Sequence, residues 1–291
     1  MNYGMGLVLG GGLSVVMEDP TYMQAYEVFR HIGCKVRVGM MDEEGLLCCE
    51  LDKCPADVVY VMPSHQFPMG MVMPLGRRQE LLEWAAGAEG RYIIEDDHDS
   101  EFRYVGKPIP SLQSRDQKDC VIYFGTFSKS ISPGLRMSYM VLPRHLSERF
   151  HRQFDFYAST VPTGQQLAVR RFLETGDFER HLNRMRRVYK AKHDFLLREL
   201  KKRSWVRRIR GENAGLHLVV AVDTAQTESE LVAEALERGV RVYGMSSYRI
   251  GERTAKEPVT LLLGFGGLSE EELSEGLAVL DELLSGGNRN G

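Results

Sequence analysis

Short apolar runs alternate with amphipathic segments through the first half of the chain. Runs rich in β-branched and aromatic residues are typical of buried strands, and they are Ser14–Met17, Cys34–Val38, Asp57–Met62, Arg91–Ile94 and Val121–Phe124. Between them, Tyr22–Ile32 and Leu75–Ala86 carry apolar side chains at helical spacing. Strands and helices that alternate in this way connect by right-handed crossovers, so the pattern predicts a mainly parallel α/β sheet.

The last third of the chain has a different pattern. A long helix is predicted over Phe178–Leu200, followed by strands at Gly215–Val220, Val240–Val242 and Val259–Phe265 and helices at Glu228–Arg238 and Ser269–Leu284. Ser269 and Glu272 have the spacing of a capping box at the start of the last helix. We therefore predict a large domain over residues 1–187 and a small α+β domain over residues 188–291.

Composition narrows the class of protein. The chain has 291 residues and a net charge of −3, with no long block of like charges, so nothing indicates direct nucleic-acid binding. The cysteines show no pairing or metal-ligand spacing, which favours free thiols; they are Cys34, Cys48, Cys49, Cys54 and Cys120. The apolar stretch Met5–Val16 is broken by the turn Gly10–Gly12, well short of a membrane span. We expect a cytoplasmic protein with no membrane partner.

Three of the predicted strands end in polar residues. These ends are Ser64–Gln66, Asp96–His98 and Thr126–Lys129. Open α/β sheets bind ligands beyond the carboxyl ends of their strands, so we expect these side chains to meet in one crevice.

The loop Gly125–Arg136 combines hydroxyl groups, an amine and a guanidinium. Hydroxyls and an arginine fork bind phosphate, while a lysine amine forms a Schiff base with an aldehyde, which together indicate pyridoxal phosphate. An ordinary solvated loop would explain the same residues. The acidic stretch Glu95–Asp99 would pair with the pyridine nitrogen of such a cofactor; a metal site or solvated acidity are the alternatives. Because Lys129 and Arg136 would share the crevice, we predict no metal.

Several longer motifs carry a family resemblance. They are Glu18–Tyr22, Pro63–Pro68, Glu95–Tyr104, Gly106–Leu112, Gly125–Arg136, Val161–Gln166 and His181–Tyr189. Together they resemble the C-terminal aminotransferase-like domain of GntR-family transcriptional regulators of the MocR type, over essentially the whole chain. The resemblance implies the fold-type I architecture of pyridoxal-phosphate enzymes, with helices on both faces of the sheet, and a homodimer.

The resemblance also implies roles for seven residues. Lys129 would form the Schiff base and move the α-proton of the substrate, and Asp96 would pair with the pyridine nitrogen. The remaining cofactor ligands would be Tyr22 stacked on the ring, His98 near the ring hydroxyl, and Thr126, Ser128 and Arg136 at the phosphate. His98 departs from the family, which usually has tyrosine there.

Other departures concern the termini and the substrate side. We expect a truncated member, because the winged-helix DNA-binding module and a Ser-Gly-x-Gln phosphate turn are missing from this sequence. The place of the family's carboxylate-binding arginine is apolar, near Leu262, and Arg249 or Arg253 are possible substitutes. His217, between two leucines on a strand, is interpreted as a structural histidine.

Two functions follow from the resemblance. The first is a pyridoxal-phosphate-dependent aminotransferase-like enzyme that acts on an amino compound or amino acid through Lys129. The second is a cofactor- or effector-sensing module of a MocR-type regulator, without its DNA-binding domain and without efficient turnover.

Overall fold

A six-stranded sheet forms the frame of the first half of the chain. The computed structural model describes residues 12–53, 56–251 and 257–285. The strands follow the order β2 (Lys35–Gly39), β1 (Ser14–Glu18), β5 (Val58–Val61), β6 (Tyr92–Asp97), β7 (Val121–Thr126) and β8 (Ser138–Val141). The first five run parallel, and β8 is antiparallel to β7. The predicted parallel sheet is confirmed.

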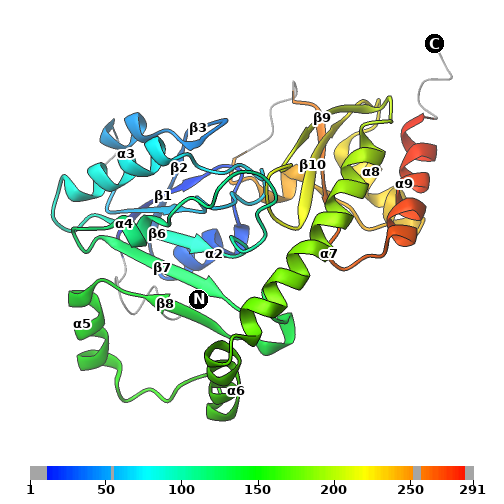
Figure 1. Cartoon of the computed structure of the whole chain (residues 1–291). Helices are drawn as coiled ribbons and strands as arrows, with labels where there is room; N and C mark the ends of the chain where they lie inside the picture. The colour runs from blue at the N-terminus through cyan, green and yellow to red at the C-terminus, as the bar shows by residue number, and fades with distance from the viewer. Residues whose placement is uncertain (1–11, 54–55, 252–256, 286–291) are drawn as a thin grey trace.

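Helices cover both faces of this sheet (Figure 1). On one face, Val15, Tyr60 and Phe124 pack with α2 (Met23–His31) and α5 (Arg144–Phe154). On the other face, alternate residues such as Val16, Val59 and Val121 pack with α3 (Leu75–Ala86) and α4 (Leu112–Arg115). Because alternate side chains of each strand enter two different apolar cores, these strands have continuous apolar sequences.

The last third forms a second, antiparallel sheet. Its strands follow the order β11 (Tyr243–Gly244), β12 (Val259–Gly264), β10 (His217–Val222) and β9 (Val206–Arg210). One face packs against α7 (Asp177–Leu200), α8 (Glu228–Glu237) and α9 (Glu270–Ser285). The predicted strand at Val240–Val242 is wrong: buried Val242 packs into this core, and strand pairing begins only at Tyr243.

The capping box at the start of α9 is confirmed. The Ser269 N–H donates to Glu272 Oε2 at 2.7 Å, and the Glu272 N–H donates to Ser269 Oγ at 3.2 Å. These two bonds satisfy backbone donors that the first helical turn cannot satisfy itself.

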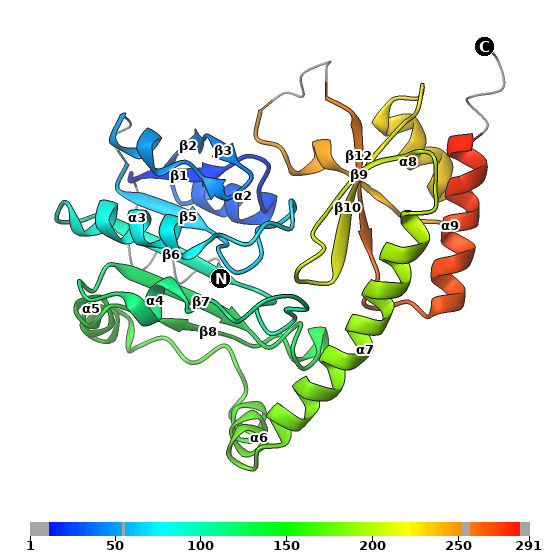
Figure 2. The same cartoon turned by 45° about the horizontal axis from the view of Figure 1, so that its top comes forward.

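Helix α7 links the two sheets. It begins next to the helix α6 (Thr163–Glu174) and runs to the core of the small sheet (Figures 1 and 2). The predicted domain boundary between residues 187 and 188 falls inside this helix and stays a prediction.

Free thiols are found at Cys34, Cys48, Cys49 and Cys120, and Cys54 lies outside the described residues. Gly10 and Gly11 of the predicted turn also lie outside the described residues. In the described ranges, no helix combines the length and the apolar composition needed to cross a bilayer.

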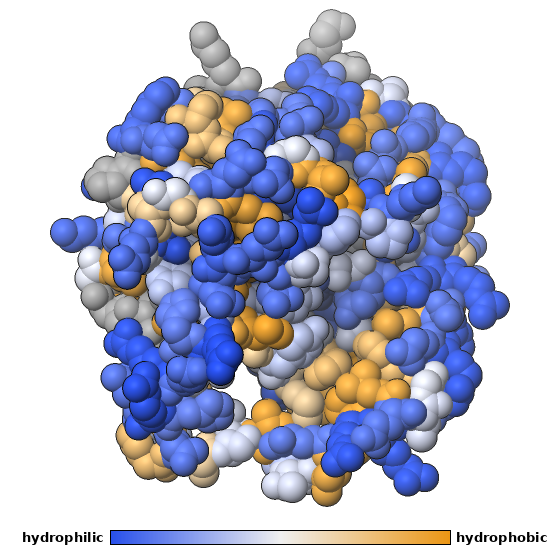
Figure 3. All heavy atoms as spheres, turned by 60° about the vertical axis from the view of Figure 1, so that its left-hand side comes forward, coloured by the Kyte–Doolittle hydropathy of each residue, from blue (hydrophilic) through white to orange (hydrophobic). Residues whose placement is uncertain are grey.

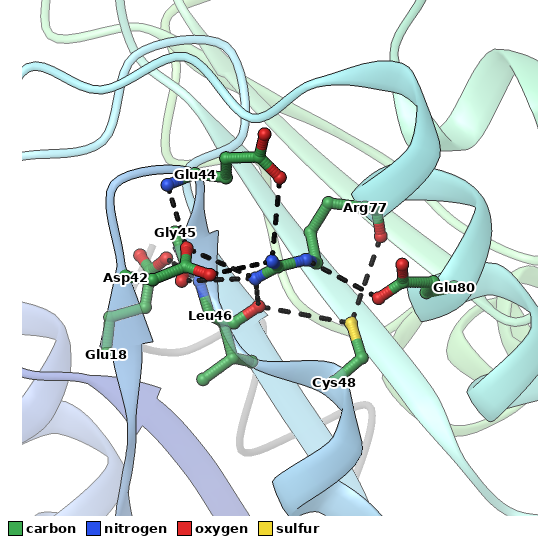
Figure 4. A network of polar contacts seen from close by, with 8 residues as sticks. All are labelled: Glu18, Asp42, Glu44, Gly45, Leu46, Cys48, Arg77 and Glu80. Atoms are coloured by element: carbon green, nitrogen blue, oxygen red, sulfur yellow. Dashed lines mark hydrogen bonds and ion pairs between the residues drawn. The ribbon is translucent and has the colours of Figure 1, made fainter.

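A small hairpin follows β2 and is fixed by one arginine. Its strands are β3 (Met41–Asp42) and β4 (Gly45–Leu46), and the 3₁₀ helix η1 (Cys48–Lys53) comes next. Arg77 of α3 donates to Asp42 Oδ2 at 2.9 Å and to the Leu46 carbonyl at 2.6 Å (Figure 4). Buried Glu18 accepts from the Leu46 N–H at 3.2 Å. The hairpin is therefore held by Arg77 of α3 and by Glu18 of β1.

The small-sheet core gives a stability prediction. Leu261 is fully buried, whereas Leu236 on α8 is 52% exposed. Leu261→Ala should lower the free energy of unfolding by about 2–5 kcal/mol, and Leu236→Ala by less than about 1 kcal/mol. Urea unfolding followed by circular dichroism measures both. Equal losses for the two variants would contradict the assignment of this core.

Glu18 gives a pH prediction. Burial raises its pKa from 4.5 to about 7. In that window the folded protein holds a proton that the unfolded chain releases, so stability falls as the pH rises from about 4.5 to 7. Glu18→Gln removes this loss. The unfolding free energy of the variant relative to that of the unmodified protein should therefore be higher at pH 8 than at pH 5 by about 1–3 kcal/mol. The exposed Glu44→Gln variant is the control, and a pH-independent effect of Glu18→Gln refutes the prediction.

Candidate active site

A cavity of about 580 Å³ lies where the strand ends of the large sheet face the small sheet. All seven residues predicted to bind the cofactor line it, namely Tyr22, Asp96, His98, Thr126, Ser128, Lys129 and Arg136. The fold thus brings together the seven residues that were predicted from the sequence.

Strand register explains this convergence. In the β6–β7 pair, Asp96 lies opposite Phe124 and Asp97 lies opposite Gly125, so the two strands end at the same level. A Cβ atom at Gly125 would overlap the ring of Tyr139 on β8, so a larger residue would displace this exposed ring. The loop after β7 therefore starts directly beside the acidic end of β6.

The end of the cavity beside β7 carries hydroxyls and cations. Thr126 Oγ1 donates to Ser128 Oγ at 3.0 Å and accepts from the Ser128 N–H at 3.1 Å. Arg136 has a left-handed backbone with φ of 50° after the 3₁₀ turn η2 (Pro133–Leu135). Within the described part of the chain, Lys129 and Arg136 make no hydrogen bond or ion pair, so their positive charges are available to a bound anion.

The β6 side of the cavity carries a buried carboxylate. Asp96 Oδ2 accepts from the Tyr60 hydroxyl of β5 at 2.5 Å. Burial raises the pKa of Asp96, and burial together with the Asp96 charge raises the pKa of Tyr22, which stands at the start of α2. A carboxylate in this setting gains stability from a cationic partner.

The other acidic residues of this stretch have separate structural partners. Glu95 accepts from the backbone N–H groups of Leu112 at 3.0 Å and Gln113 at 2.9 Å, at the start of α4. Asp97 accepts from the Tyr123 hydroxyl at 2.7 Å. Since all of them are buried, solvated acidity does not explain the cluster.

Histidines surround Asp99 at the edge of the cavity. His65 Nδ1 lies 2.9 Å from Asp99 Oδ2, and His98 Nε2 lies 3.3 Å from Asp99 Oδ1. Burial alone would raise the pKa of Asp99, but the two facing imidazoles lower it below its usual range. Ligand atoms of His65, His98 and Asp99 lie within 4.8 Å of one another, a spacing that metal ions accept. The predicted lack of a metal site therefore stays a prediction.

His217 has the structural partner expected of it. Its Nε2 donates to the Pro68 carbonyl at 2.9 Å, and burial lowers its pKa to about 3, so the ring is neutral. It also lines the cavity, which the sequence did not indicate.

Apart from His217, the cavity wall on the side of the small sheet is apolar. Leu216 and Leu262 line it, together with Phe67 from the loop after β5. Leu262, the position where an apolar residue was expected in place of the arginine, lines the cavity. Arg249 lies in a neighbouring cavity, and Arg253 lies outside the described residues. Phe67 and Leu216 were not predicted, because an apolar residue carries no signal that separates a cavity wall from a core.

Comparisons with known proteins agree with this geometry. The sequence profile of the aminotransferase class I and II family matches residues 3–280. The HTH-type transcriptional regulator YdeL of Bacillus subtilis is 40% identical over 92% of this chain and 57% of its own length. The pyridoxine biosynthesis regulator PdxR of Corynebacterium glutamicum is 31% identical over 92% of this chain and 57% of its own length.

A solved aminotransferase structure has a similar fold. Kynurenine aminotransferase of Pyrococcus horikoshii, in complex with PMP, has a TM-score of 0.84 and 25% identity, covering 99% of this chain and 72% of that one. This chain spans somewhat more than half the length of the regulators that it matches. Profile, relatives and fold together show that the chain belongs to the aminotransferase class I and II family, in its fold-type I architecture.

Proposed function

We propose that the protein is a pyridoxal-phosphate-dependent, aminotransferase-like protein that holds its cofactor through Lys129 and acts on an amino compound. One observation carries this proposal. A lysine without an ion-pair partner in the described chain shares one cavity with a hydroxyl and arginine cluster and with a buried carboxylate.

The residues present fit the cofactor. A cavity of about 580 Å³ is within the size range of small-molecule sites. Thr126, Ser128 and Arg136 supply donors for a phosphate, while Asp96 supplies an anion for a protonated ring nitrogen. The raised pKa of Asp96 marks a carboxylate that burial penalises until a cation faces it.

Each residue then has a defined task. Pyridoxal phosphate supplies an aldehyde for an amine and a ring that withdraws electrons from the carbon next to the substrate nitrogen. The Lys129 amine would hold the cofactor aldehyde and, when free, would take and return a proton at the substrate α-carbon. Asp96, which accepts a hydrogen bond from the Tyr60 hydroxyl, would keep the ring nitrogen protonated. Tyr22 would limit movement of the ring, and His98 would lie near the ring hydroxyl.

A second candidate function has its own support. Several of the similar proteins are transcriptional regulators, and this chain matches their aminotransferase-like part. In that function the same site senses the cofactor or an amino effector without efficient turnover. Turnover of an amino donor with a keto acid separates the two functions.

Further parts of the proposal concern assembly and location. We propose a cytoplasmic homodimer with domains at residues 1–187 and 188–291 and no nucleic-acid contact by this chain. Exposed apolar side chains, including Tyr139 on β8 and Phe156, Tyr157 and Leu167 around α6, offer area for self-association. Figure 3 shows apolar patches between polar side chains on one face of the molecule.

Lys129→Ala should abolish the visible absorption band that develops when the protein is titrated with pyridoxal phosphate, since no amine remains to hold the aldehyde. Lys118→Ala, an exposed lysine before β7, is the matched control and should leave the band unchanged. A band of normal size in the Lys129 variant would disprove the assignment.

Asp96→Asn should leave the band but slow reaction with an amino donor by about a hundredfold, or about 2.7 kcal/mol, because the amide cannot stabilise a protonated ring nitrogen. Stopped-flow absorbance at saturating cofactor measures the rate. Unchanged kinetics would show that another group performs this task.

A further inference from the structure

A second cavity, of about 300 Å³, lies on the same face of the small sheet as the cofactor cavity. Along β10, Leu218 and Val220 point into the core, whereas Val219 and Ala221 line the second cavity. Their neighbour on β12, Thr260, lines it as well, while Leu262 lines the cofactor cavity. The two cavities are therefore adjacent along one sheet surface.

Strand β9 brings arginines to this surface. Arg208 and Arg210 both line the second cavity. Arg210 pairs with Val219, and Val219 pairs with Leu262, so all three lie in one row across the sheet. Arg210 is thus two strands, or about 10 Å, from Leu262, where the cofactor cavity has its apolar wall.

Arg210 has an unused donor. Its side chain is only 25% exposed, and its Nε is buried with no hydrogen-bond acceptor in the described chain. Burial also lowers the pKa of this guanidinium, although the Glu43 charge opposes the shift. A buried donor without an acceptor costs free energy that a ligand oxygen would recover.

The contacts of these arginines indicate the type of ligand. Arg210 Nη2 donates to Glu43 Oε1 at 2.7 Å, and Arg208 Nη2 donates to Glu43 Oε2 at 3.2 Å, so one carboxylate already bridges the two guanidinium groups. Glu43 is 64% exposed and belongs to the hairpin that Arg77 fixes through its neighbours Asp42 and Glu44 (Figure 4). The Glu43–Arg208 pair has both side chains more than half exposed and contributes little stability, so a competing carboxylate can displace Glu43 from Arg208.

The acidic side chains in the lining face other partners. Glu257 accepts from Arg249 Nη2 at 2.5 Å, and Glu228 accepts from the Ser246 N–H at 2.9 Å and from the Ser246 hydroxyl.

We propose that the second cavity binds a small carboxylate ligand through Arg210 and Arg208, in competition with Glu43. This site is separate from the cofactor site and does not depend on the function proposed above.

Isothermal titration calorimetry of the full chain with succinate tests the proposal. Saturable binding of succinate is expected, and the uncharged analogue succinamide should bind at least about tenfold more weakly. Arg210→Gln should weaken succinate binding by at least about tenfold. Arg207→Gln is the matched control on the same strand, because Arg207 is exposed, pairs with Asp223 at 2.9 Å and does not line the cavity. It should change the affinity by less than about twofold.

Glu43→Gln keeps the test decisive if Arg210→Gln impairs folding. Removing the competing carboxylate should tighten succinate binding by about threefold or more. Three results would overturn the proposal: no saturable binding up to about 10 mM succinate, equal binding of succinamide, or unchanged affinity in both the Arg210 and Glu43 variants.

Discussion

The hydrogen-bonded register of the parallel sheet is the constraint on which the site depends. Because β6 and β7 pair in parallel with Asp96 opposite Phe124, the carboxylate of one strand and the lysine loop of the next emerge at one edge. A shift of one residue would turn Asp96 to the other face and separate it from Tyr60. The apolar cores on both faces hold the register, so the packing of α2 and α3 also positions polar chemistry that neither helix contains.

The small sheet supplies the opposite wall of the cavity, and its apolar and charged residues lie at different places along that wall. Leu262 presents an apolar surface to the cofactor cavity, and the arginines of β9 lie in the neighbouring cavity on the same face. The positive charges of this sheet thus lie near the hairpin that carries Glu43, and not in the cavity that Lys129 lines. If both proposals hold, the cavity lined by Lys129 binds an amine and the cavity lined by Arg210 binds an acid.

Sequence patterns predicted the buried elements well and the exposed ones poorly. Strands between two cores, such as β5 and β7, have continuous apolar runs, and the Ser269 capping box has fixed spacing. The exposed edge strands β8 and β9 were not predicted because they lack an apolar run, whereas the exposed edge strand β2 was predicted from its valines. At the site, seven of the residues that line the cavity were predicted from motifs. Phe67, Leu216 and the contact of Asp99 with His65 were not, since they depend on segments far apart in the sequence.

The central claim is that Lys129 holds the cofactor. Borohydride reduction of the protein mixed with pyridoxal phosphate, followed by peptide mapping with mass spectrometry, tests it most directly. One phosphopyridoxyl group on the peptide that contains Lys129 is the expected result. A modification spread over surface lysines, or one confined to another lysine, would contradict it.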